Sequence, residues 1–594
     1  MNRISPPRRR PRRRLLPVLL LIAAVLVVGA LLTAVVLSLR GGSARQEPEA
    51  DPHAGQVYIN DGFNMVWMTP HEGIPASGLA QEDFRRDTND DGSDGVRVRY
   101  LGAEYATRWG VDVSNHQGTI DWAALKRQGI DFAYLRLGLR GYGEKGSLYP
   151  DRSFDSYYSG ARAAGIEACE AYVSSRDSFR AMTTEGEVVE YESNLTRGLG
   201  FRGLYRGRMG YASTEAFDEE AVGQLVRGVM ESAELCEDED EAPLYDGGEP
   251  VPDMDLRSPA LAQVTPQEKI DRVLAMEKLV KESDPRIDKT AHNVINTGSY
   301  TVRIVNSHGM DRSYTEDVCA LYGQATAKDG DFVSSSGYGV AARSFDGLDV
   351  QKVGGEVARR TLDGLNAAPV PSGKYRVVFF SEAMCDLLGV FSSIFSAETA
   401  QKGMSLLKGR VGERIAAPCV TLVDDPLMEG GMGSRPFDDE GVPSATHTVV
   451  EDGVFRTFLH NLKTARKDGV ATTGNARKVG YASAVHVTPT NFYLKPGKRT
   501  LDDMLRGIGE GLVITEVSGL HAGANPISGD FSLLAKGYTF REGRREKPVE
   551  QITVAGNFYE LLSAVRELAS DLTFPMGGIG CPSVDVGELS VSGT

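Results

Sequence analysis

Ser-Gly-Leu-His-Ala-Gly-Ala-Asn-Pro-Ile-Ser-Gly-Asp-Phe-Ser, residues 518 to 532, is a stretch dominated by Gly, small polar and turn-forming residues. Gly permits positive φ, and Asn525-Pro526 and Gly529-Asp530 are turn dipeptides. The strand-like run from Leu512 to Val517 comes directly before it. A loop of this kind next to a strand indicates a binding surface carried on a β scaffold. Composition alone equally allows two stacked hairpin turns.

The size and charge of the chain limit what it can be. Its 594 residues predict roughly three to four domains. The net charge of −16 argues against nucleic acid as the main partner, because phosphate binding needs a basic face. The six cysteines form no Cys-x-x-Cys pair and no zinc-module spacing, which predicts reduced, partly buried thiols. They are Cys169, Cys236, Cys319, Cys385, Cys419 and Cys581.

The N-terminal region predicts a membrane anchor. Residues Leu15 to Leu39 carry no charge and follow the Arg-rich run Arg8 to Arg14. As a helix they would span roughly 37 Å, enough to cross a bilayer core with some tilt. The apolar core of a cleaved signal peptide, the alternative, is only about 7 to 15 residues long. We therefore expect residues 1–40 to be a cytoplasmic tail and single-pass anchor, with the bulk of the chain extracytoplasmic.

Residues 41–107 are expected to form a linker and a small β-rich spacer, and residues 108–165 a strand-helix-strand-helix unit. Within this unit, Trp109 to Gly118 and Phe132 to Gly138 resemble the first quarter of family-25 glycoside hydrolases, lysozymes built on a (β/α) barrel. Asp112 matches the acidic residue on that family's first strand. The family's second acidic pair has no counterpart after Ile166, so the barrel is truncated and lysozyme activity is not expected.

From residue 166 onward the chain resembles the TldD/PmbA family, specifically its PmbA branch, also called TldE. The resemblance implies an α+β N-terminal region at 166–370 and a β-rich C-terminal domain at 371–594. The fold class is therefore mixed α/β and β-rich, in several domains. The residues that carry the resemblance are Asp424 to Leu427, Ser434 to Gly441, Thr472 to Arg477, Gly519 to Ser532 and Val554 to Asn557.

Local patterns predict several elements of this region. Thr265 and Glu268 form a capping box ahead of a helix, and Val350, Val353 and Val357 recur at helical spacing. The Gly-punctuated run 198–214 predicts a hairpin ladder. A hairpin is also expected between 446–450 and 455–459.

The resemblance also locates a metal-site position. In the TldD branch a helix carries His-Glu-x-x-x-His, whose imidazoles hold zinc while the Glu handles the proton of the attacking water. The matching positions here are Ser381, Glu382 and Asp386. Both imidazoles are missing, so no zinc site and no metal ligand is assigned to this chain. Glu382 should lie in the first turn of an apolar helix, where the helix dipole stabilises it. Cys581, which matches a C-terminal Cys near the TldD metal, is predicted to be a buried structural thiol.

The resemblance implies a non-catalytic subunit that pairs with a zinc-bearing TldD-like partner, as a heterodimer or larger assembly, to degrade unfolded peptides. His521, Asn525 and Asp530 are then the predicted substrate-binding residues. Two alternatives stay open: a membrane-anchored lysozyme using Asp112, and a peptide-binding protein without a protease partner. Because the resembling family is cytoplasmic, the anchor also raises the hypothesis of a fusion near Gly165, without which the protein would be cytoplasmic.

Overall fold

The computed structural model describes residues 168–217, 219–235 and 244–594, together with shorter elements before residue 168. The chain divides into two units, Met1–Thr107 and Arg108–Thr594. Within the described residues, no helix is both long enough and apolar enough to cross a bilayer. The anchor predicted at 15–39 lies outside the described residues, so it stays a prediction.

The first unit contains four short strands, as expected of a small β-rich spacer within residues 41–107. They form an antiparallel hairpin of β1 (Val57–Asn60) and β2 (Met65–Met68), and a second hairpin joins β3 (Phe84–Thr88) to β4 (Asp94–Tyr100).

The second unit begins with the predicted strand-helix-strand. β5 (Gly110–Val113) and β6 (Phe132–Leu135) pair in parallel, with α2 (Trp122–Arg127) between them in the chain. Parallel pairing requires such a crossover connection. Asp112 lies in β5 opposite Tyr134. A short hairpin of β7 (Gly138–Arg140) and β8 (Leu148–Pro150) follows. The second helix expected in this unit would come after Pro150, where residues 151–167 lie outside the described residues.

A seven-stranded antiparallel sheet forms the next part, in the order β11-β10-β9-β13-β14-β12, with β15 on β14. β10 turns into β11 through Arg206 and Gly207, both at positive φ, which confirms the predicted hairpin ladder. The strands are β9 Cys169–Thr184, β10 Glu187–Tyr205, β11 Arg208–Thr214, β12 Ile287–Thr290, β13 Asn293–Asn306, β14 Asp311–Asp329 and β15 Phe332–Ala342.

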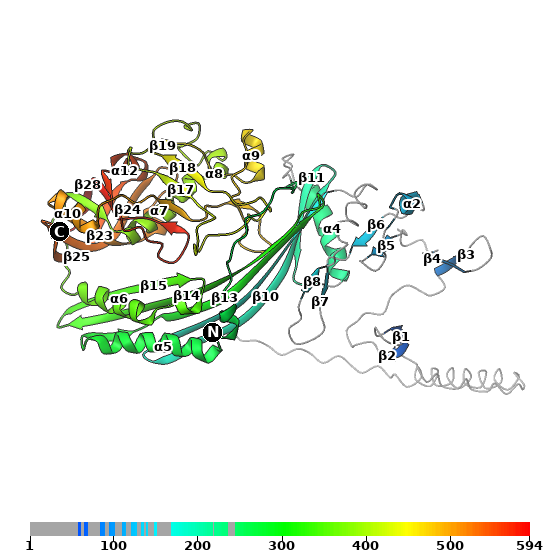
Figure 1. Cartoon of the computed structure of the whole chain (residues 1–594), viewed down its shortest axis with the longest axis horizontal. Helices are drawn as coiled ribbons and strands as arrows, with labels where there is room; N and C mark the ends of the chain where they lie inside the picture. The colour runs from blue at the N-terminus through cyan, green and yellow to red at the C-terminus, as the bar shows by residue number, and fades with distance from the viewer. Residues whose placement is uncertain are drawn as a thin grey trace, which may run out of the picture. The chain divides into compact units, whose positions relative to one another are not determined.

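Two helices lie alongside these long strands (Figure 1). α5 (Pro266–Ser283) begins with the predicted capping box: Thr265 accepts the Glu268 backbone N–H, and Glu268 accepts that of Thr265. α6 (Val350–Asp363) buries Val353 and Val357, as the helical spacing predicts. Both helices share an apolar core with β13 and β14. α4 (Glu219–Leu235) lies against β10 and β11, and short η2 (Pro259–Gln263) and η3 (Phe345–Gly347) precede α5 and α6.

Five strands of the C-terminal part close into a ring, because β16 pairs in parallel with β23 and antiparallel with β28. β24 and β25 complete the circuit, and β26 adds to β28. The strands are β16 Gly373–Phe379, β23 Glu510–Ser518, β24 Asp530–Arg541, β25 Arg544–Asn557, β26 Glu567–Leu568 and β28 Val584–Ser592. Helix α7 (Ser381–Phe391) follows β16 directly and packs its apolar side chains into the core that these strands share.

A second C-terminal sheet has the order β19-β18-β17-β22-β27. The predicted hairpin is present, but its second strand is only Val454–Phe455, because the chain then turns away and Leu459 pairs with Ser396. The strands are β17 Leu422–Asp424, β18 His447–Glu451, β19 Val454–Phe455, β22 Phe492–Leu494 and β27 Ile579–Gly580, and β20 Ala476–Arg477 pairs with β21 His486–Val487. The helices are η4 Ser392–Phe395, α8 Ala397–Gln401, α9 Leu462–Asp468, α10 Leu501–Ile508, α11 Leu520–Gly523 and α12 Phe558–Ala564.

Candidate functional site

The start of α7 is the position where the sequence suggested a degenerate metal motif. Glu382 lies in the first turn of this helix, as predicted, but a specific cation also holds it. The two guanidinium nitrogens Nη1 and Nη2 of Arg360, on α6, bind the two Glu382 carboxylate oxygens at 2.5 and 2.6 Å. Both side chains are largely buried. The helix dipole is therefore not the main stabiliser of Glu382, and the arginine partner was missed because it lies on another element.

Ser381 is buried and bound within the protein. Its hydroxyl accepts a hydrogen bond from the Thr573 hydroxyl at 3.3 Å, and its backbone N–H donates to the Ser583 hydroxyl at 3.2 Å. Ser583 in turn donates to the Asp571 carboxylate at 2.7 Å. These contacts fix the helix start against the segment that precedes β28.

Cys385 and Cys581 are also buried here, as predicted for Cys581. The Cys385 thiol donates to the Thr573 carbonyl at 3.5 Å. Burial, and secondarily the neighbouring Cys385, raise the pKa of the Cys581 thiol well above its usual value. The neutral thiol is thus favoured, whereas zinc ligation needs the thiolate.

The residues at the start of α7 do not fit a zinc ion. Zinc takes His nitrogen, Cys thiolate or carboxylate oxygen, and here a serine hydroxyl replaces the first of these ligands. Both oxygens of Glu382 are occupied by Arg360. Across the described residues, His, Cys, Asp and Glu side chains form no group of three or more placed to hold a metal. No chemistry through a metal is therefore derived for this chain.

The carboxyl of Asp386, a partly exposed residue of α7, gives a pH-dependent prediction. Partial burial, then the Glu382 and Glu516 carboxylates, raise its pKa to about 6. Because this folded-state pKa lies above the ordinary value of 3.8, the folded protein binds the proton more tightly than the unfolded chain. The stabilising contribution is present below about pH 4 and is lost as the pH rises through 6. The unfolding temperature of Asp386→Asn should therefore fall less than that of the unmodified protein between pH 4.5 and 7.

Solvent screening at this exposed site limits the difference to less than about 1 kcal/mol. Asp502→Asn, a change of the same type in the first turn of α10, serves as a control. Parallel pH profiles for the Asp386→Asn variant and the unmodified protein would contradict the assignment.

The loop of Ser518 to Ser532 connects antiparallel β23 and β24 through the single helical turn α11 and a tight turn, not through two stacked hairpins. The predicted binding residue His521 is exposed on α11. Asn525 is exposed, and its side-chain oxygen accepts the backbone N–H groups of Ile527 and Ser528. Asp530 is exposed and accepts from Asn557 at 2.9 Å, which lowers its pKa. The fold thus uses Asn525 and Asp530 to shape the loop.

A buried charged cluster between the first sheet and the C-terminal part was not found from the sequence. Arg202 on β10 binds both oxygens of Glu170 at 2.8 and 3.0 Å, and its Nη1 lies 3.5 Å from Glu440. All three side chains are at most 2% exposed. Nearby, the Tyr172 hydroxyl donates to Asp439 at 3.1 Å. This cluster joins parts of the chain that lie far apart in the sequence.

Three of the five sequence blocks that carried the family resemblance, 424–427, 434–441 and 472–477, meet in space. The Asn475 amide donates to Asp424 at 2.7 Å, and Asp438 accepts the Ala476 N–H at 3.0 Å. Asp439 accepts the Lys478 N–H at 2.7 Å. The blocks were therefore a usable signal of a shared buried network, although their spacing does not reveal which side chains pair.

Comparison with known proteins agrees with this architecture. Three domain models of one family match in order: PmbA/TldA metallopeptidase domain 1 at residues 169–233, the central domain at 259–365 and the C-terminal domain at 372–593. The chain belongs to the PmbA/TldD family. The solved structure of a proposed modulator of a DNA gyrase from Thermotoga maritima is 31% identical, with a TM-score of 0.68. That match covers 74% of this chain and 99% of the other.

Further relatives of the PmbA/TldD family cover the same part of the chain. Metalloprotease PmbA of Escherichia coli O157:H7 is 28% identical over 72% of this chain and 92% of its own length. TldE from Thermococcus kodakarensis shares the fold, with a TM-score of 0.66 at 23% identity, over 74% of this chain and 98% of its own. The chain is thus a multidomain, β-rich, metalloprotease-like protein, and the first of the three family domains begins at residue 169.

Proposed function

We propose that this chain is the non-catalytic, PmbA/TldE-type subunit of a TldD/TldE-type metalloprotease that acts on unfolded peptides. The observation that carries the proposal is the start of α7, where Ser381 is hydrogen-bonded inside the protein and Arg360 holds Glu382. A glutamate bound in this way is not available as a base for water. The zinc and the general base are then supplied by a TldD-like partner chain.

An exposed apolar region supports the presence of a partner. On β10, next to its turn from β9, four large apolar side chains are 43 to 58% exposed: Val188, Val189, Tyr191 and Leu195. Apolar side chains gathered at a surface are typical of protein contacts, since a partner would remove them from water. The loop that carries His521, Asn525 and Asp530 is our proposed peptide-contacting surface.

The proposal is tested with the purified full chain, alone and with a partner chain from the same organism that carries His-Glu-x-x-x-His. Alone, the chain should retain no stoichiometric zinc and should not cleave an unfolded peptide. Together, the two chains should co-purify and cleave it. A Glu→Gln change in the partner's motif should lower the rate by at least about a hundredfold.

Glu382→Gln in this chain is the matched comparison, and the rate of the complex should stay within about twofold, since general-base loss costs far more. Tightly bound zinc together with peptide cleavage by this chain alone would contradict the proposal. If the complex forms but Glu382→Gln abolishes cleavage, Glu382 is a catalytic residue and the non-catalytic role is wrong.

The N-terminal features enter this proposal only from the sequence. Residues 15–39 would anchor the subunit in a membrane, and residues 108–165 would be a lysozyme-like addition without its second acidic pair. The parallel pairing of β5 and β6 agrees with the start of a (β/α) barrel, and no further observation favours hydrolysis of a cell wall.

A further inference from the structure

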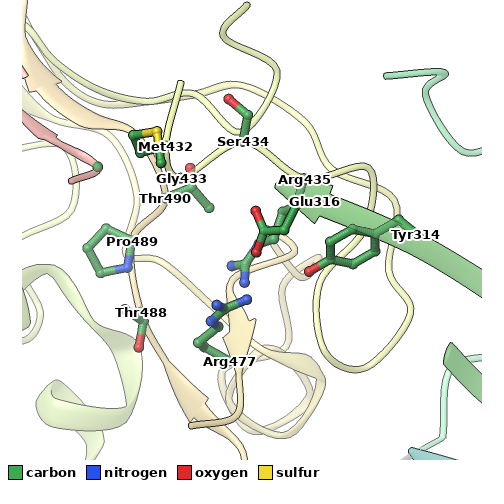
Figure 2. Close-up of a pocket in the computed structure, with 11 residues that line it drawn as sticks. Tyr314, Glu316, Met432, Gly433, Ser434, Arg435, Arg477, Thr488, Pro489 and Thr490 are labelled. Atoms are coloured by element: carbon green, nitrogen blue, oxygen red, sulfur yellow. The ribbon is translucent and has the colours of Figure 1, made fainter. Parts of the chain in front are cut away.

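A small pocket lies beside the buried network, between β14 of the first sheet and loops of the C-terminal part (Figure 2). Its volume is about 180 Å³. Two arginines, Arg435 and Arg477, line it together with Tyr314 and Glu316 from β14. Met432 and Pro489 add apolar surface. The pocket thus combines cationic groups with space for a small organic group.

Arg435 is the unusual member of this set. Its side chain is only 4% exposed, yet the buried Nε and Nη2 atoms have no hydrogen-bond partner within the described residues. A buried guanidinium without partners is costly, because it has lost water and gained no acceptor. Its charge acts on Asp424 and Asp438. The oxygens of these carboxylates, however, accept other donors: Asn475 Nδ2 and the backbone N–H groups of Thr490, Glu440, Val442 and Ala476.

Two further donors face the same space. The buried Tyr314 hydroxyl also has no hydrogen-bond partner in the described part of the chain. Arg477 Nη1 lies 3.8 Å from Asp439, beyond hydrogen-bond distance. Figure 2 shows the Tyr314 hydroxyl and the Arg477 guanidinium directed toward the centre of the pocket.

Glu316 is the carboxylate that lines the pocket. It is held by Arg343 at 2.6 Å, and both of these side chains are mostly buried. This ion pair offsets the Glu316 charge and leaves Arg435 as the cation whose hydrogen bonds are unmade. The missing partner is therefore an acceptor, and an anionic one offers the strongest compensation.

We propose that this pocket binds a carboxylate group, with Arg435 and the Tyr314 hydroxyl as donors and Arg477 as the cation at its exposed side. The planar guanidinium matches the two oxygens of a carboxylate. The carboxylate is either the C-terminus of a peptide or a free organic acid. The proposal that the pocket binds a carboxylate does not depend on the proposed protease function. Only the assignment of a peptide C-terminus as the source of that carboxylate rests on it.

The test is isothermal titration and thermal unfolding of the full chain with three probes: tetra-alanine with a free C-terminus, its C-terminal amide, and sodium acetate. The free-acid peptide or acetate should bind and raise the unfolding temperature, and the amide should not. Binding of the acid peptide alone identifies a peptide C-terminus as the source, and binding of acetate alone identifies a free organic acid. Equal binding of the acid and the amide, or no binding of any probe, overturns the proposal.

Arg435→Met should weaken binding by about ten- to a hundredfold, the effect of losing a charged hydrogen bond. It also removes a positive charge that acts on the buried carboxylates of Asp424 and Asp438, so it should lower the unfolding temperature of the ligand-free protein, and the affinity of the folded variant is the deciding measurement. Unchanged binding by the folded variant would make Arg435 a structural residue and overturn the assignment.

Tyr314→Phe keeps the ring, which packs edge-on against Phe437 with centroids 5.1 Å apart, and removes only the hydroxyl. Tyr314→Phe should weaken binding about three- to tenfold. If Arg435→Met fails to fold, this variant tests whether the pocket binds the carboxylate. Arg456→Met, at a half-exposed arginine paired with Glu451, is the matched control and should leave binding unchanged. The same loss in this control and in Tyr314→Phe would also overturn the proposal.

Discussion

Arg202→Met is expected to destabilise the protein by about 3 to 5 kcal/mol, because breaking a buried ion pair leaves uncompensated charge in the interior. Arg202 holds Glu170 through two hydrogen bonds and lies 3.5 Å from Glu440. After the change, both carboxylates would stay buried without this cation. The cluster connects the first sheet to the C-terminal part, so the loss of stability should appear in the unfolding of both parts.

Urea unfolding followed by far-UV circular dichroism measures this effect. Tryptophan fluorescence is unsuitable, since the three tryptophans are Trp67, Trp109 and Trp122, all before the family domains. Arg456→Met is the control: its partner is Glu451, both side chains are about half exposed, and the expected cost is at most about 1 kcal/mol. Equal shifts in the urea midpoint for the two variants would mean that the buried cluster contributes no more than a surface pair.

Phe391→Ala is expected to cost about 3 to 5 kcal/mol, as for other fully buried aromatic residues. Phe391 ends α7 and is stacked on Phe558, with ring centroids 4.5 Å apart and planes 7° from parallel. It also meets Phe531 of β24 at 6.4 Å. The substitution opens a cavity where α7, α12 and the ring of strands share their core, so the helix that carries Ser381 and Glu382 should loosen.

The measurement is again the urea midpoint, with Phe332→Ala as the comparison. Phe332 is 50% exposed at the start of β15, and its loss should change stability by no more than about 0.5 kcal/mol. Phe391→Leu, which keeps most of the buried volume, should lie between the two. If Phe391→Ala is as stable as Phe332→Ala, the core around α7 is not tightly packed.

Elements with local signals were predictable. The capping box at Thr265 and Glu268 forms with both of its hydrogen bonds, because its partners are three residues apart. The helical spacing of Val350, Val353 and Val357 gave α6 for the same reason. The candidate site was predictable only in part. The sequence located Ser381, Glu382 and Asp386 on a helix after a strand, but it did not indicate Arg360 as the partner of Glu382.

Longer connections could not be read from patterns of this kind. Arg376 of β16 binds Asp585 of β28 across 209 positions of the chain, beside the strand pairing that closes the ring. Arg202 and Glu440 likewise come from different sheets and loops. Periodicity reports which face of an element is buried, and it carries no information about which distant face it meets. For the same reason, the sequence could not predict that buried hydrogen-bond donors of Arg435 and Tyr314 lack a partner within the described residues.

The stretch from Ser518 to Ser532 shows most clearly what the sequence determined and what the tertiary structure decided. By itself the sequence determined that the chain turns here between strands, because Gly519 and Gly529 adopt positive φ and Asn525 caps a tight turn. Only the tertiary structure decided that Asp530 is bound by Asn557 from β25 and that His521 is left exposed on α11. Turn formation depends on the backbone preferences of adjacent residues, whereas the availability of a side chain depends on which distant residues the fold places beside it.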